Sequence, residues 1–92
     1  MNETTAFVKA RDKMLLKCSV EELRKFVKNN GKYYDTEFIT AVLFAKDEFL
    51  EMVLHKMIVN CTSLPFDFRQ KSADWLLDRG LHLEIWSVDD ET

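Results

Sequence analysis

Residues 19–31 read SVEELRKFVKNNG, and this stretch predicts a helix more clearly than any other part of the chain. Ser19, with Glu22 three positions later, matches a capping box, and Gly31 follows as a stop signal. The apolar positions between them recur at helical spacing: Val20, Leu23, Phe26 and Val27. The stretch therefore indicates a short amphipathic helix with one apolar face.

Similar patterns on either side predict four further helices. Their first residues are indicated by Thr4 or Thr5, by Asp35 or Thr36, by the pair Asp47 and Glu48, and by Asp67. The helix after Asp35 has almost no polar face, so we expect it to be surrounded at the centre of the domain. Pro65 interrupts the pattern before the last helix, and Gly80 ends that helix.

The composition agrees with this helical pattern. The chain has 92 residues, 47% of them hydrophobic, with two Gly and one Pro. This size suits one domain over residues 1–92, and the scarcity of turn residues favours helices over sheets. Residues 81–86, LHLEIW, alternate in polarity and predict either an extended arm over the helices or a strand that pairs with a second copy, while residues 88–92 form a mobile acidic tail. We therefore expect an all-α fold, a compact bundle or short solenoid of about five helices with a C-terminal extended segment.

Two stretches resemble the second helix of ankyrin repeats. They are residues 19–31 and residues 45–53, AKDEFLEMV, and residues 75–80, WLLDRG, resemble the closing element of the same helix. No segment reads Thr-Pro-Leu-His, and Leu23 and Leu50 lie 27 positions apart, whereas the ankyrin repeat has a period of about 33 residues. The resemblance implies stacked helix pairs that act as a protein-binding scaffold.

Charge is distributed unevenly along the chain. The net charge is -3, but residues 1–46 sum to +3 and residues 47–92 to -6. Such a division suits an electrostatic partner, head-to-tail self-association, or attraction between the two halves of one molecule. The longest uncharged stretch, residues 57–66, is too short to span a membrane, so we expect a cytoplasmic protein. In that compartment, Cys18 and Cys61 are expected to be buried and reduced.

The sequence offers little for catalysis. It has two histidines, His55 and His82, and neither lies in a metal-binding or nucleophile motif. Glu51 and His55 are four residues apart, and they could hold a metal with Cys61, but an ordinary pair on a helix surface explains them better. We therefore predict that the chain is not an enzyme and uses neither cofactor nor metal.

The favoured function is binding to another protein. The aromatic residues of the predicted loops and the acidic end of the chain are the candidate contacts: Tyr33, Tyr34, Phe66, Phe68, Trp86, Asp89 and Asp90. In size and lack of motifs, the chain resembles small inhibitors and adaptors encoded by phages and mobile elements, which act by occupying a surface of a host protein. A homodimer through residues 81–86 stays open at this point.

The alternative function is binding to nucleic acid. Three lysines recur every four residues on the first predicted helix, and further cations lie on the second, so the two groups would form a basic patch if these helices were neighbours. The residues concerned are Lys9, Lys13, Lys17, Arg24, Lys25 and Lys28.

Overall fold

The chain folds into five α-helices and one short 3-10 helix in the computed structural model, which describes residues 3–84. In chain order they are α1 (Glu3–Lys17), α2 (Val20–Asn29), η1 (Gly31–Tyr33), α3 (Thr36–Phe44), α4 (Asp47–Val59) and α5 (Phe66–Asp78). All regular structure within this range is helical, which confirms the all-α prediction. None of these helices is long and apolar enough to cross a membrane.

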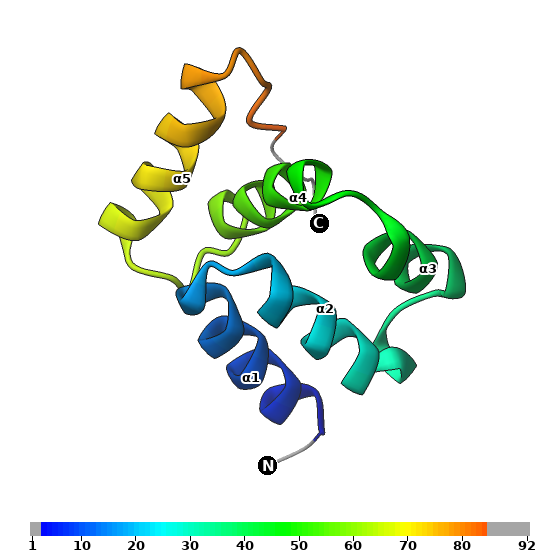
Figure 1. The fold of residues 1–92 in the computed structure, drawn as a ribbon. Helices are drawn as coiled ribbons and strands as arrows, with labels where there is room; N and C mark the ends of the chain where they lie inside the picture. Colours follow the sequence, from blue (N-terminus) through cyan, green and yellow to red (C-terminus); the bar gives the residue numbers. More distant parts are fainter. Residues whose placement is uncertain (1–2, 85–92) are drawn as a thin grey trace.

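Two helices hold the others together. Helix α2 contacts α1, α3 and α4, and α4 contacts α1, α2 and α5 (Figure 1). Helices α1 and α2 form an antiparallel hairpin, α3 lies on the far side of α2, and α5 packs along α4. The result is a globule of 37 × 33 × 25 Å.

The hydrophobic core lies mainly between α2 and α4. Leu23 and Val27 of α2 and Leu50, Leu54 and Ile58 of α4 are almost fully buried. The remaining buried residues of this cluster come from α1, α3 and the connection between α4 and α5: Met14, Leu15, Val42, Cys61 and Leu64. Burying the five central side chains contributes roughly 1.5–3 kcal/mol each to the free energy of folding.

The local signals in the sequence give most of the helix ends. Ser19 Oγ accepts a hydrogen bond from the Glu22 amide at 3.3 Å, and Asp35 Oδ1 accepts one from the Phe38 amide at 2.8 Å. These contacts satisfy amide groups that the first turn of a helix leaves without partners. At the end of α5, Gly80 has a φ of 69°, and the amides of Gly80 and Leu81 bond back to carbonyls of the last turn.

The expectation that the third helix lies at the centre is wrong. In α3, Val42 is the one buried residue, and Phe44 is 82% exposed. Helix α4 takes the central position, because its apolar positions face both the core and α5, whereas α3 reaches the core along one edge only. The apolar sequence of α3 therefore does not lead to complete burial, because this short helix keeps some apolar side chains, such as Phe44, exposed to solvent.

Three smaller expectations also need correction. Helix α5 begins at Phe66 rather than after Asp67, and Pro65 precedes it without a side-chain cap. Cys18 is exposed rather than buried, because it forms the turn between α1 and α2 with a φ of 49°. The expected loop over residues 32–34 is partly the 3-10 helix η1.

The C-terminal segment lies against α4 as far as the structure describes it. Residues 81–84 have no regular secondary structure, and Leu81 and Leu83 are half-buried while His82 and Glu84 are exposed. Glu84 bonds to the end of α4, since Lys56 Nζ reaches its carboxylate at 2.7 Å. The rest of the predicted segment, with Trp86, and the acidic tail at 88–92 lie outside the described residues.

The core assignment predicts a large difference between two leucine substitutions. Leu54→Ala should lower the free energy of unfolding by about 2–5 kcal/mol, because it leaves a cavity between α2 and α4. Leu77→Ala, at a position that is 56% exposed, should change it by less than about 0.5 kcal/mol. Urea unfolding followed by circular dichroism measures both, and equal losses would contradict this description of the core.

Candidate functional site

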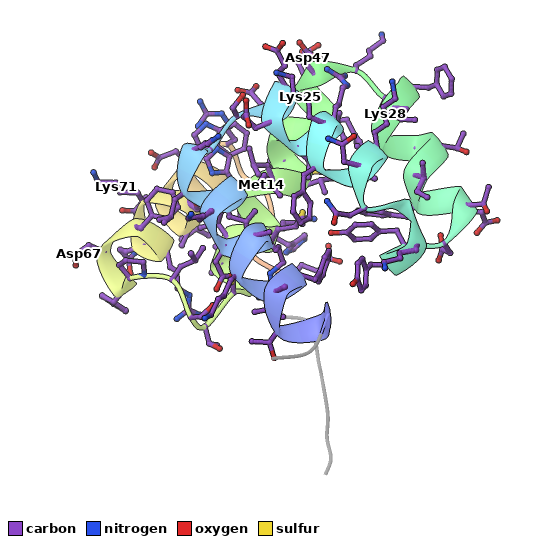
Figure 2. The ribbon with its side chains drawn as sticks, turned by 90° about the horizontal axis from the view of Figure 1, so that it is seen from below. Met14, Lys25, Lys28, Asp47, Asp67 and Lys71 are labelled. Carbon is purple, nitrogen blue, oxygen red and sulfur yellow. The ribbon has the colours of Figure 1, made fainter. Side chains whose placement is uncertain are left out.

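A groove runs between α1 and α2 on the surface of the hairpin. Its volume is about 580 Å³, and we call it the α1–α2 groove. The lining residues are Ala10, Lys13, Met14, Leu16 and Lys17 of α1, and Glu22, Lys25, Phe26, Asn29 and Asn30 from α2 and its C-terminal end. Figure 2 looks onto these two helices, with Met14 labelled on α1 and Lys25 and Lys28 on α2.

Helical periodicity explains which side chains of α2 line this groove. On α2, the core residues Leu23 and Val27 lie on one face, whereas Glu22 and Phe26 lie one position before them and line the groove. Leu23 and Val27 are not part of the lining, while Met14 of α1 belongs to both the core and the lining, so the groove borders the core.

The floor of the groove is apolar and partly open to solvent. Met14 is buried, Phe26 is half-buried, and Leu16 is 48% exposed. Leu16 is therefore an apolar side chain open to solvent between two exposed lysines, Lys13 and Lys17. This floor could cover apolar side chains of a ligand.

The rim of the groove is positively charged. Lys13 and Lys17 lie one turn apart on α1, and Lys25 lies opposite on α2. The carboxylate of Glu22, on α2, pairs with lysines of both walls: Oε1 lies 3.2 Å from Lys17 Nζ, and Oε2 lies 4.0 Å from Lys25 Nζ. Three cations and one carboxylate leave an excess of positive charge around an apolar floor.

The basic residues predicted from sequence do not act as one patch. Lys13, Lys17 and Lys25 line the groove, and Lys9 and Lys28 are exposed outside its lining. Their side chains remain accessible, so the nucleic-acid prediction is not excluded for these five. Arg24 is different.

Arg24 extends away from the groove to the junction of α3 and α4. Its guanidinium donates to the carbonyl oxygens of Val42 at 3.3 Å and Ala45 at 2.8 Å, and it pairs with Asp47 at 2.8 Å. It therefore satisfies carbonyl groups at the C-terminal end of α3, where a positive charge is favoured. The donors of Arg24 are engaged within the fold, so the structure does not bring this guanidinium together with the groove lysines, and its role in nucleic-acid binding stays a prediction.

The two predicted tyrosine contacts belong to an aromatic cluster. Tyr33 stacks on Phe7 with ring centroids 4.2 Å apart, and Tyr34 stacks on Phe38 at 5.0 Å. Both tyrosines are half-buried, so these contacts attach η1 to α1 and α3. A role for them in binding stays a prediction, and it would use only their exposed edges.

The other predicted aromatic contacts differ in exposure. Phe66 is 71% exposed at the start of α5, whereas Phe68 is half-buried and packs against the core. Trp86, Asp89 and Asp90 lie outside the described residues. Sequence reasoning did not identify Leu16 as a contact, although an apolar residue beside Lys13 and Lys17 was a visible signal.

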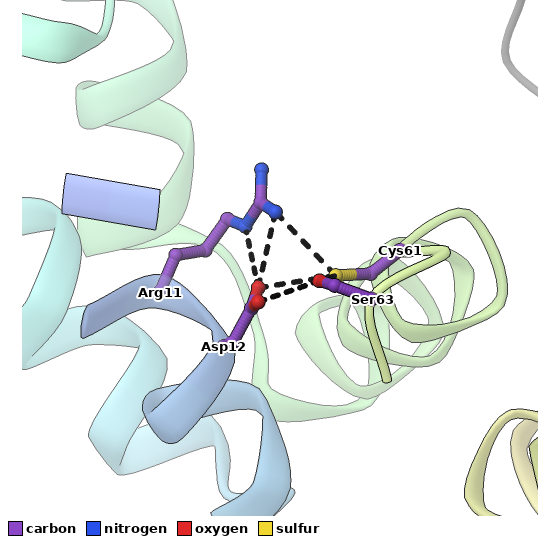
Figure 3. A network of polar contacts seen from close by, with 4 residues as sticks. All are labelled: Arg11, Asp12, Cys61 and Ser63. Carbon is purple, nitrogen blue, oxygen red and sulfur yellow. Dashed lines mark hydrogen bonds and ion pairs between the residues drawn. The ribbon is translucent and has the colours of Figure 1, made fainter. Parts of the chain in front are cut away.

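A polar network joins α1 to the connection between α4 and α5 (Figure 3). Asp12 Oδ1 accepts hydrogen bonds from Arg11 Nη2 at 3.0 Å and from Cys61 Sγ at 3.2 Å, and Asp12 Oδ2 accepts one from Ser63 Oγ. Partial burial alone would raise the pKa of the Asp12 carboxyl, but the bonds from Ser63, Cys61 and Arg11 lower it overall. The Cys61 thiol thus acts as a donor to a carboxylate, in an arrangement that stabilises the fold.

A second cluster joins α4 to α5. His55 Nδ1 lies 2.9 Å from Ser72 Oγ, and the imidazole stacks on Trp75 with centroids 4.2 Å apart. The Arg79 guanidinium covers the same indole at 3.9 Å. Trp75 is therefore half-buried in a surface stack rather than in the central cluster.

Of the residues weighed as a metal-binding combination, Glu51, His55 and Cys61, the last two have other contacts. His55 bonds to Ser72, while Cys61 bonds to Asp12. Within residues 3–84, no three side chains of the metal-binding types lie together.

Comparison with protein-family models, with curated proteins and with solved structures finds no match for this chain. The ankyrin resemblance therefore stays a prediction from sequence.

The environment of His55 predicts a pH-dependent stability. Burial lowers the pKa of His55, Glu51 opposes this by raising it, and Arg79 lowers it. Because the folded pKa lies below the unfolded value of 6.5, the unfolded state binds a proton more readily, and stability is lost as the pH falls below about 6.5. Urea unfolding of the unmodified chain and of His55→Gln between pH 7.5 and 5 measures this. A decline of equal size in both proteins would contradict it.

The two thiols are expected to react at different rates. Cys18 is exposed, although desolvation and the nearby Glu51 raise its thiol pKa, and Cys61 is 6% exposed. Ellman's reagent at pH 8 should therefore label one thiol in the native protein and the second only on unfolding. Cys18→Ser should remove the native reaction, and prompt labelling of Cys61 in that variant would contradict the structure.

Proposed function

We propose that this chain is a non-enzymatic protein-binding module, acting as a small inhibitor or adaptor, and that it binds its partner in the α1–α2 groove. The observation that carries the proposal is the combination of an apolar floor, including the 48% exposed Leu16, with a rim of three lysines. The volume of about 580 Å³ falls within the range of ligand-binding clefts.

The chemistry of the side chains supports binding rather than catalysis. Cys61 is buried against Asp12, and Ser72 is 3% exposed beside His55. Cys18 is exposed, but desolvation and Glu51 raise its thiol pKa, which disfavours the reactive thiolate. By contrast, Leu16 and the three rim lysines are exposed and belong to two helices that contribute to the core. A rigid surface of this kind limits the entropy lost on association.

Nucleic acid remains the alternative occupant of the same face. Lys9, Lys13 and Lys28 are exposed beside or near the groove and could contact phosphates. The apolar floor favours a protein, because phosphates would leave Leu16 and Phe26 uncovered by apolar atoms.

The proposal predicts that one substitution removes the partner. The tagged full-length chain should recover a stoichiometric protein from its native or host lysate, with or without nuclease, as identified by mass spectrometry. Leu16→Glu should reduce this recovery by about tenfold or more, because it places a charge on the apolar floor. Leu77→Glu, a matched change at another exposed leucine, should leave it unchanged.

Two results would contradict this proposal. Retention by Leu16→Glu together with loss by Phe66→Glu would move the binding surface to the start of α5. Loss of all partners on nuclease treatment would favour nucleic acid.

A further inference from the structure

We infer that the occupant of the α1–α2 groove is an amphipathic helix of a partner protein with acidic residues on both sides of its apolar stripe. This inference rests on the proposed function and specifies the partner's chemistry. It combines the shape of the groove, the positions of its charges and the composition of its floor.

The shape of the groove suits a helix. Its α1 wall runs from Ala10 to Lys17, a length of roughly 12 Å at 1.5 Å per residue, and its α2 wall has a similar length. The two walls are antiparallel helices that contact each other (Figure 1), and a third helix can pack against such a pair. Residues 3–84 contain no strand whose edge could pair with an extended peptide.

The charges specify acidic flanks on that helix. Lys13 and Lys17 are four residues apart on one rim, so carboxylates one turn apart on the partner would face both. Lys25 lies on the opposite rim, so a carboxylate on the other flank of the partner helix would face it. Glu22 balances part of this charge by pairing with Lys17 and Lys25, and the remaining excess is positive.

The floor specifies the stripe between those flanks. Leu16 and Phe26 offer aliphatic and aromatic surface, beside the buried Met14, to apolar residues that recur at i, i+3, i+4 and i+7. A helix with this stripe and these flanks would fill the floor and neutralise the rim together. A uniformly acidic segment would satisfy only the rim, and a uniformly apolar one only the floor.

The experiment uses a defined probe because the partner is not identified. The probe is a fluorescein-labelled 18-residue peptide with Leu at i, i+3, i+4 and i+7 and Glu on both flanks, titrated with the full-length chain and followed by anisotropy. Three comparison ligands separate the alternatives: a peptide of the same composition with the stripe permuted, a peptide with Lys in place of Glu, and a labelled 20-base-pair DNA duplex.

Matched variants locate the binding surface. Lys13→Glu with Lys17→Glu reverses two rim charges, and Lys46→Glu with Lys71→Glu makes the same change in net charge at exposed positions away from the lining. Circular dichroism checks that each variant is folded, and Lys13→Gln with Lys17→Gln provides a milder change if the first pair unfolds.

The expected result is selective binding of the acidic amphipathic peptide. The rim variant should weaken it by about tenfold or more, the control variant should leave it nearly unchanged, and added salt should weaken the interaction by screening it. Equal binding of the permuted peptide, equal losses in both variants, tighter binding of the duplex, or no binding of the probe would overturn the inference. Self-association of the chain that the peptide displaces would make a second copy the occupant and would also overturn it.

The two proposals can fail separately. If the probe does not bind but the lysate partner still requires Leu16, the groove remains the binding site and only the acidic helix is wrong. If the lysate partner is retained by Leu16→Glu, the proposed function in the groove is itself wrong.

Discussion

The packing of α2 against α4 is the contact on which the rest of the structure depends. Leu23 and Val27 meet Leu50, Leu54 and Ile58 in the most completely buried part of the molecule. Every other helix is attached to one of these two, since α1 and α3 contact α2, and α5 contacts α4. Because a chain of this size has one central core, loss of this contact would release all the surfaces at once.

Polar contacts then fix the ends that the core does not reach. Arg24 links the last carbonyls of α3 to Asp47 at the start of α4, and Asp12 links α1 to the connection before α5. Solvent screens the exposed contacts among these, such as the ion pair with the 76% exposed Asp47, so they contribute at most about 1 kcal/mol each. These contacts also attach each wall of the α1–α2 groove to the rest of the fold. Arg24 attaches α2 to the junction of α3 and α4, and Asp12 attaches α1 to the connection before α5.

The elements that the sequence predicted correctly are those with local causes. The caps at Ser19 and Asp35 and the stop at Gly80 each involve residues a few positions apart, so a short pattern contains the whole interaction. The placements that failed depend on partners far along the chain. Nothing near Arg24 in sequence indicates that the ends of α3 and α4 will occupy its guanidinium, and the apolar pattern of α3 does not reveal that α4 takes the centre. The groove could be predicted in part. The spacing of the lysines on α1 is evident in the sequence, but the sequence does not show that Leu16 and Phe26 line the same groove.

The structure shows where the positive charge of the N-terminal half of the chain lies. The excess of cations in residues 1–46 includes the lysines of α1 and α2, two helices whose apolar positions also contribute to the core. A carboxylate that approaches Lys13 or Lys25 therefore meets a surface whose shape the core has already fixed. Mutual repulsion among the rim lysines costs little in the unbound state, since Glu22 lies between the walls and pairs with two of them. An acidic helix would add the remaining counter-charge and cover Leu16, which the fold alone leaves in contact with water.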